Sequence, residues 1–336
     1  MQEREQAIER VREILERVGF YVSDAHGIRP TSFDLVARRD STLLLLKILK
    51  NIDALSPEDA ERLTELAGLF RATTLIVGRS SGASQLEAGV VYTRYGVPIV
   101  VEETFEEQLL HGVPPFLVSS PGGIFARIDG PRLQTLREAR GLSLGALAQV
   151  AGVTRRTIQL YEEGGGAEVT VVSRLEQYLR EPVVLPIELL PRSTPRDGGK
   201  PKGRTTDRSP KERVAENRPL ESTGDPVRDD VFRRLGSMGW EVVVTIRCPF
   251  DAFTHGGTGK DEELLLTAVG SLRSAQHRAE VLQGIARAIE GYSMFVTSQP
   301  TGRESVDGLP LLSVPELRRH RDRAELLDLL HEREGT

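Results

Sequence analysis

Cysteine is nearly absent from this 336-residue sequence, in which Cys248 is the single example. The chain can therefore form no internal disulfide and no cysteine-based zinc cluster. Such sparse cysteine usage is typical of proteins in a reducing cytosol. The sequence also lacks an apolar run of the roughly 20 residues that a bilayer-spanning helix needs, and its charged N-terminal segment is unlike a signal peptide. We expect a cytoplasmic protein with no membrane partner.

An excess of positive charge is also missing, because the net charge is −5 at pH 7. This value argues against a uniformly basic protein that coats DNA, although a locally basic surface on an acidic body remains compatible with it. The hydrophobic fraction of 39% and the charged fraction of 28% suit a soluble chain with some linker. The length is sufficient for two or three domains, each with its own core.

Large apolar residues are almost missing from residues 192–224, which hold nine Lys or Arg and five Asp or Glu, a net charge of +4. Such a segment cannot bury enough surface to offset the entropy cost of ordering it. We expect a flexible basic linker over 191–225. The alternative is a basic arm that adds nonspecific contacts to phosphates.

Two α/β regions are predicted on either side of the middle of the chain, over 1–115 and 226–336. In each, a helical stripe is followed by short apolar runs typical of strands. The runs recur in order: "ERVGFYV" matches "GSMGWEVVV", "SFDLVA" matches "PFDAFT" and "LLLLKIL" matches "ELLLTAV". Because order and approximate spacing are kept, we infer an internal duplication of one mixed α/β domain.

Residues 116–129 have two strand-like runs around Pro-Gly-Gly, which predicts a connecting hairpin. Residues 130–190 are predicted to be mostly helical. Ser143 and Thr154 are placed as helix N-caps, and Gly152 lies in the tight turn between two short helices. We expect the second of these helices over 155–163, so that the pair forms a helix-turn-helix.

The helical segment resembles the Cro/CI-type, or lambda-repressor-like, helix-turn-helix family over about 60 residues, 130–190. The resemblance implies that Arg137 pairs with Glu162 and that Ala148 is small because the next helix crosses close to it. The residues that carry the pattern are Arg137, Ser143, Leu147, Ala148, Gly152, Val153, Thr154, Ile158, Tyr161, Glu162 and Gly164.

The same resemblance implies that the third helix lies in the major groove of double-stranded DNA. Arginine can bind guanine through two hydrogen bonds. At Leu144 the family often has a polar residue that contacts phosphate, and leucine cannot make that contact. The net charge of 130–164 is only +2, from five Arg and three Glu, so we expect two copies to act together as a homodimer. The implied DNA-binding residues are Thr154, Arg155, Arg156, Thr157, Gln159 and Leu160.

The α/β regions resemble the PD-(D/E)XK nuclease-like fold. In its active members, an acid near the end of the second strand and an acid-x-lysine on the third bind Mg²⁺. Asp34 and Lys47 match the first acid and the lysine, but Leu45 stands where the second acid belongs. In the second region Asp251 matches Asp34, with Leu265 and Thr267 aligned to the other two positions. We therefore expect vestigial sites without a metal or other cofactor, and no enzyme activity.

The whole arrangement resembles a family of archaeal transcriptional regulators in which a Cro/CI-type helix-turn-helix lies between two α/β regions. The expected fold class is thus multidomain, with two nuclease-like mixed α/β domains that flank a helical DNA-reading domain. The resemblance implies a sequence-specific regulator, with an effector or a component of the transcription machinery as a possible partner. The alternatives are a divergent Mg²⁺-dependent nuclease and a transcription co-factor that binds protein through its helices.

Overall fold

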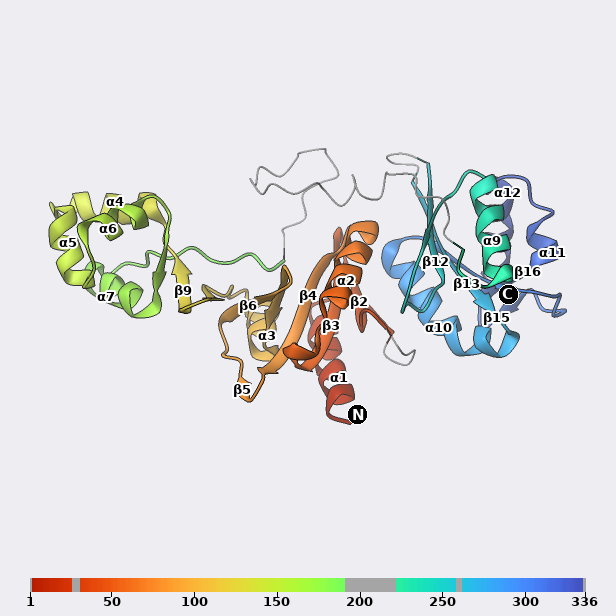
Figure 1. The fold of residues 1–336 in the computed structure, drawn as a ribbon, viewed down its shortest axis with the longest axis horizontal. Helices are drawn as coiled ribbons and strands as arrows, with labels where there is room; N and C mark the ends of the chain where they lie inside the picture. The colour runs from red at the N-terminus through yellow and green to blue at the C-terminus, as the bar shows by residue number, and fades with distance from the viewer. Residues whose placement is uncertain (1, 26–30, 191–221, 258–261, 335–336) are drawn as a thin grey trace. The chain divides into compact units, whose positions relative to one another are not determined.

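A computed structural model describes residues 2–25, 31–190, 222–257 and 262–334 (Figure 1). The fold divides into two compact units. Unit 1 comprises Met1–Lys47, Arg62–Thr73 and Ser193–Thr336, and unit 2 comprises Ile48–Glu61 and Thr74–Arg192. Unit 1 thus combines parts of the first and last of the predicted segments.

Unit 1 begins with α1 (Gln2–Arg17), whose buried face includes Ile8, Val11 and Leu15. The strands β1 (Tyr21–Asp24), β2 (Leu35–Arg39) and β3 (Thr42–Asn51) pair antiparallel in that order. The leucine run of β3 is buried, as expected of a strand covered on both faces. Both β3 and α2 (Pro57–Phe70) have residues in each unit.

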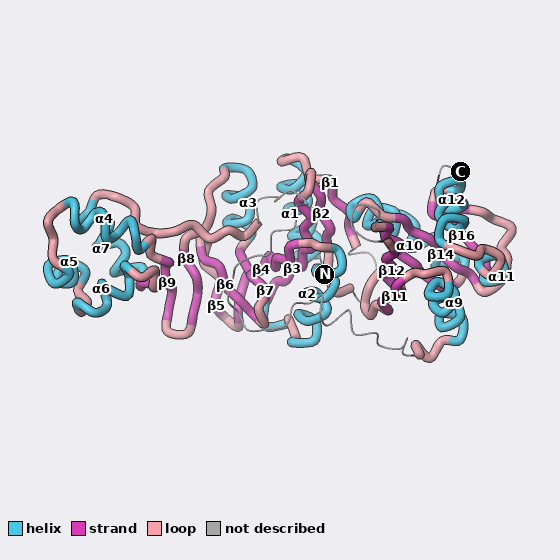
Figure 2. The backbone as a smooth tube through the Cα atoms, turned by 90° about the horizontal axis from the view of Figure 1, so that it is seen from above, coloured by secondary structure: helices cyan, strands magenta, loops and turns pink. Residues whose placement is uncertain are grey.

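The later part of unit 1 is a six-stranded sheet in the order β11-β12-β13-β14-β16-β15 (Figure 2). A core that includes Phe232, Trp240, Leu265 and Leu326 joins this sheet to its helices. The strands are β11 (Glu241–Val244), β12 (Ala252–Gly256), β13 (Glu263–Gly270), β14 (Tyr292–Thr297), β15 (Ser305–Val306) and β16 (Leu309–Ser313). The helices are α9 (Pro226–Ser237), α10 (Leu272–Ile289), α11 (Val314–Leu317) and α12 (Arg323–Arg333).

The predicted linker over 191–225 falls mostly outside the described residues, but its last four residues have a defined place. Asp229 Oδ1 accepts hydrogen bonds from the Thr223 backbone N–H at 2.8 Å and from Thr223 Oγ1 at 2.7 Å. The Asp225 carboxylate caps α9 by accepting from the Val227 backbone N–H at 2.9 Å. Residues 222–225 therefore lead directly into α9.

The same pattern of backbone hydrogen bonds is found at the start of β2 and at the start of β12. The Asp34 N–H donates to Leu46 O at 2.8 Å, and the Asp251 N–H donates to Thr267 O at 2.8 Å. Because Leu46 and Thr267 therefore occupy equivalent places, the counterpart of Lys47 is Ala268 and the counterpart of Leu45 is Leu266. The alignment of Leu265 and Thr267 to these positions was wrong by one residue.

Helix α10 contacts β13 and β14 and also β1 and β2. Arg38 Nη1 donates to Ala288 O at 3.1 Å, and Arg38 Nη2 lies 2.6 Å from Glu290 Oε2. The Arg287 guanidinium stands over the Tyr21 ring, 5.6 Å from its centroid. Helix α10 therefore holds β1 and β2 against the last third of the chain.

Unit 2 contains strands in the order β4-β7-β6-β8-β9-β10, with β5 paired to β4. The hairpin of β8 and β9 continues this sheet, because β8 pairs parallel to β6. The strands are β4 (Thr73–Ser81), β5 (Ser84–Gln85), β6 (Val90–Arg94), β7 (Val97–Val100), β8 (Leu117–Ser120), β9 (Gly123–Arg127) and β10 (Gly166–Glu168). The 3-10 helix η1 (Ile52–Ala54) and α3 (Glu102–His111) complete this part.

The helical part of unit 2 contains α4 (Gly130–Ala139), α5 (Leu144–Ala151), α6 (Arg155–Glu162) and α7 (Val169–Leu179). Their apolar faces meet in one core that includes Leu133, Leu147 and Leu175. The short strand β10 was not predicted within this segment; the glycines at 164–166 end helical structure and let the chain pair with β9. Among the described residues, no helix is long and apolar enough to cross a membrane.

Two glycines inside helices provide a matched test of the contact between α10 and β1. A Cβ atom added at Gly284 would stand 2.5 Å from Ser23 Oγ, whereas one added at Gly236 in α9 meets no atom within 4 Å. We expect Gly284→Ala to lower the free energy of unfolding by about 1–2 kcal/mol through overpacking. Gly236→Ala should raise it by up to about 1 kcal/mol through helix propensity. Urea denaturation measures both values, and equal effects would contradict the tight contact.

Candidate nucleic-acid interface

The turn between α5 and α6 is defined by two side-chain caps. Ser143 Oγ accepts a hydrogen bond from the Ala146 backbone N–H at 3.1 Å and begins α5. Thr154 Oγ1 accepts from the Thr157 backbone N–H at 3.1 Å and begins α6. Each cap satisfies a backbone donor that the first helical turn leaves without a partner. The ends of both helices are thus encoded locally.

The backbone conformation of this turn favours a glycine at position 152. Its φ of 71° lies in the left-handed region, which is unfavourable for other residues. A Cβ atom at this position would also stand 2.6 Å from Arg174 Nη1. The same Arg174 Nη1 donates to Ala151 O at 3.1 Å and so satisfies a carbonyl at the end of α5. This capping role of Arg174 was missed by sequence reasoning, because the two groups are 23 residues apart.

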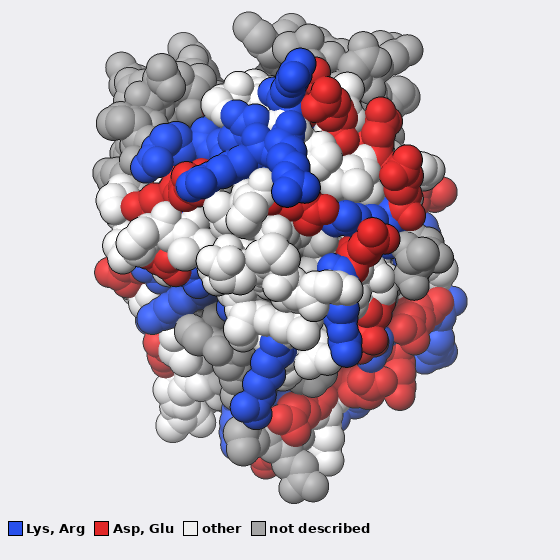
Figure 3. Space-filling model, turned by 90° about the vertical axis from the view of Figure 1, so that its right-hand side faces the viewer, with Lys and Arg blue, Asp and Glu red and all other residues white. Residues whose placement is uncertain are grey.

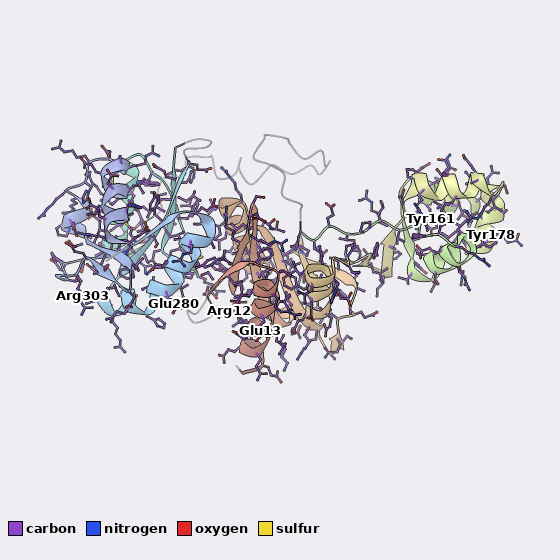
Figure 4. The ribbon with its side chains drawn as sticks, turned by 180° about the vertical axis from the view of Figure 1, so that it is seen from behind. Arg12, Glu13, Tyr161, Tyr178, Glu280 and Arg303 are labelled. Carbon is purple, nitrogen blue, oxygen red and sulfur yellow. The ribbon has the colours of Figure 1, made fainter. Side chains whose placement is uncertain are left out.

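The inner side of α6 is anchored by Ile158 and Tyr161, which are 0% and 7% exposed. They pack in the same core as Leu147 and Ala148 of α5, while Val153 of the turn lies partly buried against it. Figure 4 labels Tyr161 within the helical part and Tyr178 at its outer edge. Burial raises the pKa of the Tyr161 hydroxyl, and the nearby Glu168 carboxylate raises it further. The tyrosine therefore stays neutral at physiological pH.

An ion pair joins the last residue of α6 to α4. Arg137 Nε donates to Glu162 Oε1 at 2.5 Å, and Arg137 Nη2 donates to Glu162 Oε2 at 3.1 Å. Each side chain is only 11% exposed. The third guanidinium nitrogen, Nη1, donates to Leu142 O at 3.0 Å. Hydrogen bonding to Glu162 raises the pKa of Arg137 above its usual value, so the guanidinium stays charged. The pair joins the end of α6 to α4 through two hydrogen bonds.

The outer side of α6 is formed by the residues assigned to DNA in the sequence. Thr154, Arg155, Arg156, Gln159 and Leu160 are exposed, and Thr157 is half-buried. Leu160 is 50% exposed, which is high for a leucine. Arg155 and Arg156 form no ion pair with any residue that the structure describes. Their guanidinium groups therefore remain available to an external acceptor.

Three polar side chains on this surface already interact with one another. Thr154 Oγ1 and Thr157 Oγ1 lie 2.8 Å apart, at hydrogen-bond distance. Gln159 Nε2 lies 3.5 Å from Glu163 Oε1, one turn further along the chain. Helix α6 ends at Glu162, one residue earlier than predicted. Leu144 at the start of α5 packs partly buried on the helical core, which accounts for an apolar residue at that position.

The nuclease-like residues of the first α/β region form a different kind of site. Asp34 is fully buried and directly precedes β2. Its carboxylate is paired with Arg4 of α1, and Lys47 Nζ lies 3.7 Å from Asp34 Oδ1. Lys47 Nζ also donates to Thr31 O at 2.7 Å. The remaining position of the motif, Leu45, is a buried aliphatic residue.

The equivalent acid of the second α/β region, Asp251, is also neutralised by arginines. Its two oxygens lie 3.0 Å from Arg228 Nη2 and 3.2 Å from Arg278 Nη1. Oxygen Oδ2 accepts a further hydrogen bond from the Val269 backbone N–H at 2.8 Å. Arg4 and Arg228 were not identified from the sequence, because no local pattern marks arginines that meet an acid more than 20 residues away.

Neither acid fits a magnesium site. Magnesium requires several oxygen ligands, whereas a guanidinium group occupies the place beside each carboxylate. In the part of the chain that the structure describes, no group of three or more His, Cys, Asp or Glu side chains could hold a metal ion. Burial also raises the pKa of the Cys248 thiol to about 12. Cys248 is therefore protonated at neutral pH and is a poor nucleophile or ligand.

Family models match two parts of the chain. A PD-(D/E)XK superfamily domain matches residues 4–115, and a helix-turn-helix matches residues 133–185. The second match includes α5, α6 and the ion pair of Arg137 with Glu162. The first match includes Asp34 and Lys47 but concerns a fold, and a fold does not by itself carry an activity.

Curated relatives cover nearly the whole chain. Proteins of Halorubrum lacusprofundi and Methanocella arvoryzae are 35% and 34% identical, over 97% and 98% of this chain and 96% and 97% of their own lengths. A protein of Archaeoglobus fulgidus is 29% identical over 97% of both chains. Each bears the name "Putative HTH-type transcriptional regulatory protein". No solved structure matches the chain significantly.

The ion pair of α4 with α6 can be tested by removing one partner. We expect Arg137→Ala to lower the free energy of unfolding by about 2–3 kcal/mol, because it leaves the Glu162 carboxylate partly buried without its partner. Arg132→Ala is the matched control, since Arg132 pairs with Glu181 where both side chains are 45% exposed. The control should cost less than about 1 kcal/mol. Chemical denaturation gives both values; similar losses would contradict the special role of Arg137.

Proposed function

Because the chain belongs to the archaeal family of HTH-type transcriptional regulatory proteins that these relatives represent, we propose that it is a sequence-specific DNA-binding transcriptional regulator. One observation carries this proposal. The first turn of α6 presents Arg155 and Arg156 to solvent, while its opposite side is held by a buried core and by the Arg137–Glu162 pair. Exposed cationic side chains on a rigidly held helix are what recognition of a major groove requires.

In the proposed complex, α6 lies in the major groove with its N-terminal residues at the base edges. Arg155 or Arg156 binds guanine O6 and N7 through two hydrogen bonds, which is worth about 1–3 kcal/mol of discrimination. Thr154 and Thr157 supply hydroxyl groups for a phosphate, or a methyl group for thymine. Leu160 makes an apolar contact, and Gln159 lies beside the groove-facing side. These roles follow from the position of each residue on the outer side of α6.

We further propose that two copies bind together. One chain supplies one α6, which reads a single half-site. Two-fold symmetry places a second α6 about one turn of DNA away, so the bound sequence would be palindromic. The modest charge of the reading segment supports this arrangement, because two weak contacts on one duplex gain affinity through their high effective concentration.

The two α/β regions are, in this proposal, copies of one nuclease-like domain retained as a scaffold in a cytoplasmic protein. The shared backbone hydrogen bonds before β2 and β12 support the duplication. The arginines beside Asp34 and Asp251 support the loss of metal-dependent chemistry. Such scaffolds would hold the two copies together or bind an effector or a component of the transcription machinery. We expect these scaffolds to bind no cofactor.

A nuclease is the second candidate function, and the match of residues 4–115 to the PD-(D/E)XK superfamily is the observation in its favour. A co-factor that binds only protein is the third candidate, but it gives no reason for Arg155 and Arg156 to remain unpaired on the outer side of α6. Both alternatives make different predictions for pure protein mixed with DNA.

Sequence-specific binding can be measured by enrichment of bound duplexes from a random pool, followed by titration of the enriched site. We expect Arg155→Ala and Arg156→Ala each to weaken binding to that site about 5- to 100-fold, the loss of one bidentate base contact. Arg127→Ala is the control, because Arg127 is also exposed but lies on β9. It should leave the preference between sites unchanged. Failure to enrich any sequence would contradict the proposal.

Nuclease activity can be tested with plasmid DNA and Mg²⁺. We expect no cleavage by the full chain, because neither Leu45 nor Leu266 can ligate a metal. The deciding comparison is Asp34→Asn in a preparation that still binds DNA. Mg²⁺-dependent cleavage by the wild-type chain that disappears in this variant would establish the nuclease and overturn the scaffold proposal.

A further inference from the structure

A second group of arginines lies on the surface of unit 1, where α11 meets α12 beside α9. The group, here named the α11–α12 basic patch, consists of Arg233, Arg234, Arg318, Arg319, Arg321 and Arg323. In Figure 3, Lys and Arg side chains gather in the upper part of this face and form a continuous band bordered by acidic side chains. The patch lies outside both segments that the family models match.

Three arginines of the patch hold its backbone in place through contacts with their surroundings. Arg234 Nη2 donates to Arg318 O at 3.2 Å and also to His320 O. The Arg318 guanidinium lies 2.9 Å from Asp230 Oδ2, which ties the patch to α9. Arg323 Nη1 lies 3.8 Å from Glu263 Oε2, and the Arg323 guanidinium stands over the Trp240 ring, 5.7 Å from its centroid. These contacts fix the segment 318–323 before any ligand arrives.

The other three arginines of the patch are open to solvent. Arg319 and Arg321 are exposed, and neither forms an ion pair with another described residue. The Arg233 side chain is 74% exposed, and its contact with Asp230 Oδ1 is long, at 3.9 Å. The acids at the start of α12 are engaged by backbone groups. Asp322 Oδ1 accepts from the Glu325 N–H, and Glu325 Oε2 accepts from the Arg321 N–H.

We infer that the α11–α12 basic patch binds the phosphate backbone of duplex DNA. Guanidinium groups form paired hydrogen bonds with phosphate oxygens, and a backbone that is already fixed adds no ordering cost of its own. The reading segment 130–164 carries a net charge of only +2, so additional phosphate contacts would add affinity without sequence preference. An acidic protein is the other ligand for such a patch. Duplex DNA is favoured because binding at α6 would raise its concentration near the whole chain.

This inference rests on the proposed function, but its test does not depend on recognition of a particular sequence. The full chain is titrated with a duplex unrelated to any enriched site, at several salt concentrations. We expect the double variant Arg319→Ala/Arg321→Ala to bind this duplex more weakly. The slope of log affinity against log salt should become shallower by about 2, since each lost phosphate contact contributes about 0.9. Its preference between specific and unrelated duplexes should stay that of the wild type.

The matched control is Arg273→Ala/Arg303→Ala, which removes two exposed arginines of the same unit outside the patch. Figure 4 labels Arg303 at the outer edge of this part. The control should keep the wild-type slope. Both double variants should melt at the wild-type temperature, because none of these four side chains forms an ion pair with a described residue.

Two results would overturn the inference. One is an unchanged slope for Arg319→Ala/Arg321→Ala, or an equal change in the control. The other is that this variant loses binding to polyglutamate but keeps wild-type binding to DNA, which would assign the patch to an acidic protein. A failure of the proposed function can be told apart from these results. In that case the chain would show no preferred sequence, while the patch variant would still make the slope of log affinity against log salt shallower.

Discussion

The ion pair between Arg137 and Glu162 is the interaction on which the rest of the reading surface depends. It joins α4 to the end of α6, and its two hydrogen bonds are shielded from solvent on both partners. Core packing through Ile158 and Tyr161 holds the inner side of α6, and the ion pair adds a fixed point at the last residue of the helix. With its inner side and its end both fixed, α6 presents Arg155 and Arg156 in one direction.

The α/β regions also contain arginine–carboxylate pairs, but there the pairs involve buried acids. Each has one buried acid at the entrance of a strand, Asp34 or Asp251. In this chain arginines neutralise the acids, because a buried carboxylate without a partner would be costly. In the scaffold that we propose, the acids serve as buried partners of arginines. A fold associated with cutting DNA is in this account a scaffold for a protein that reads DNA.

The features that the sequence predicts well are those encoded within a few residues. Ser143 and Thr154 as caps, Gly152 in the turn and the apolar stripes of α5 and α6 each follow from local spacing. The alignment of Thr267 to Lys47 was wrong, because strand register depends on cross-strand hydrogen bonds that no local pattern contains. The arginines beside Asp34 and Asp251 were missed for a related reason, since their partners are distant along the chain. Strand β10 is too short to leave a period-2 pattern.

The most direct test of the central claim, that α6 reads sequence, is to map the DNA bound by the full chain across the genome of the cells that produce it. The account predicts discrete short sites that share one two-fold symmetric motif, with guanines at the positions that α6 would contact. It also predicts that a chain with both Arg155 and Arg156 changed to Ala loses these sites while the protein remains folded. Binding spread evenly over the genome, or the same sites in that variant, would contradict the claim.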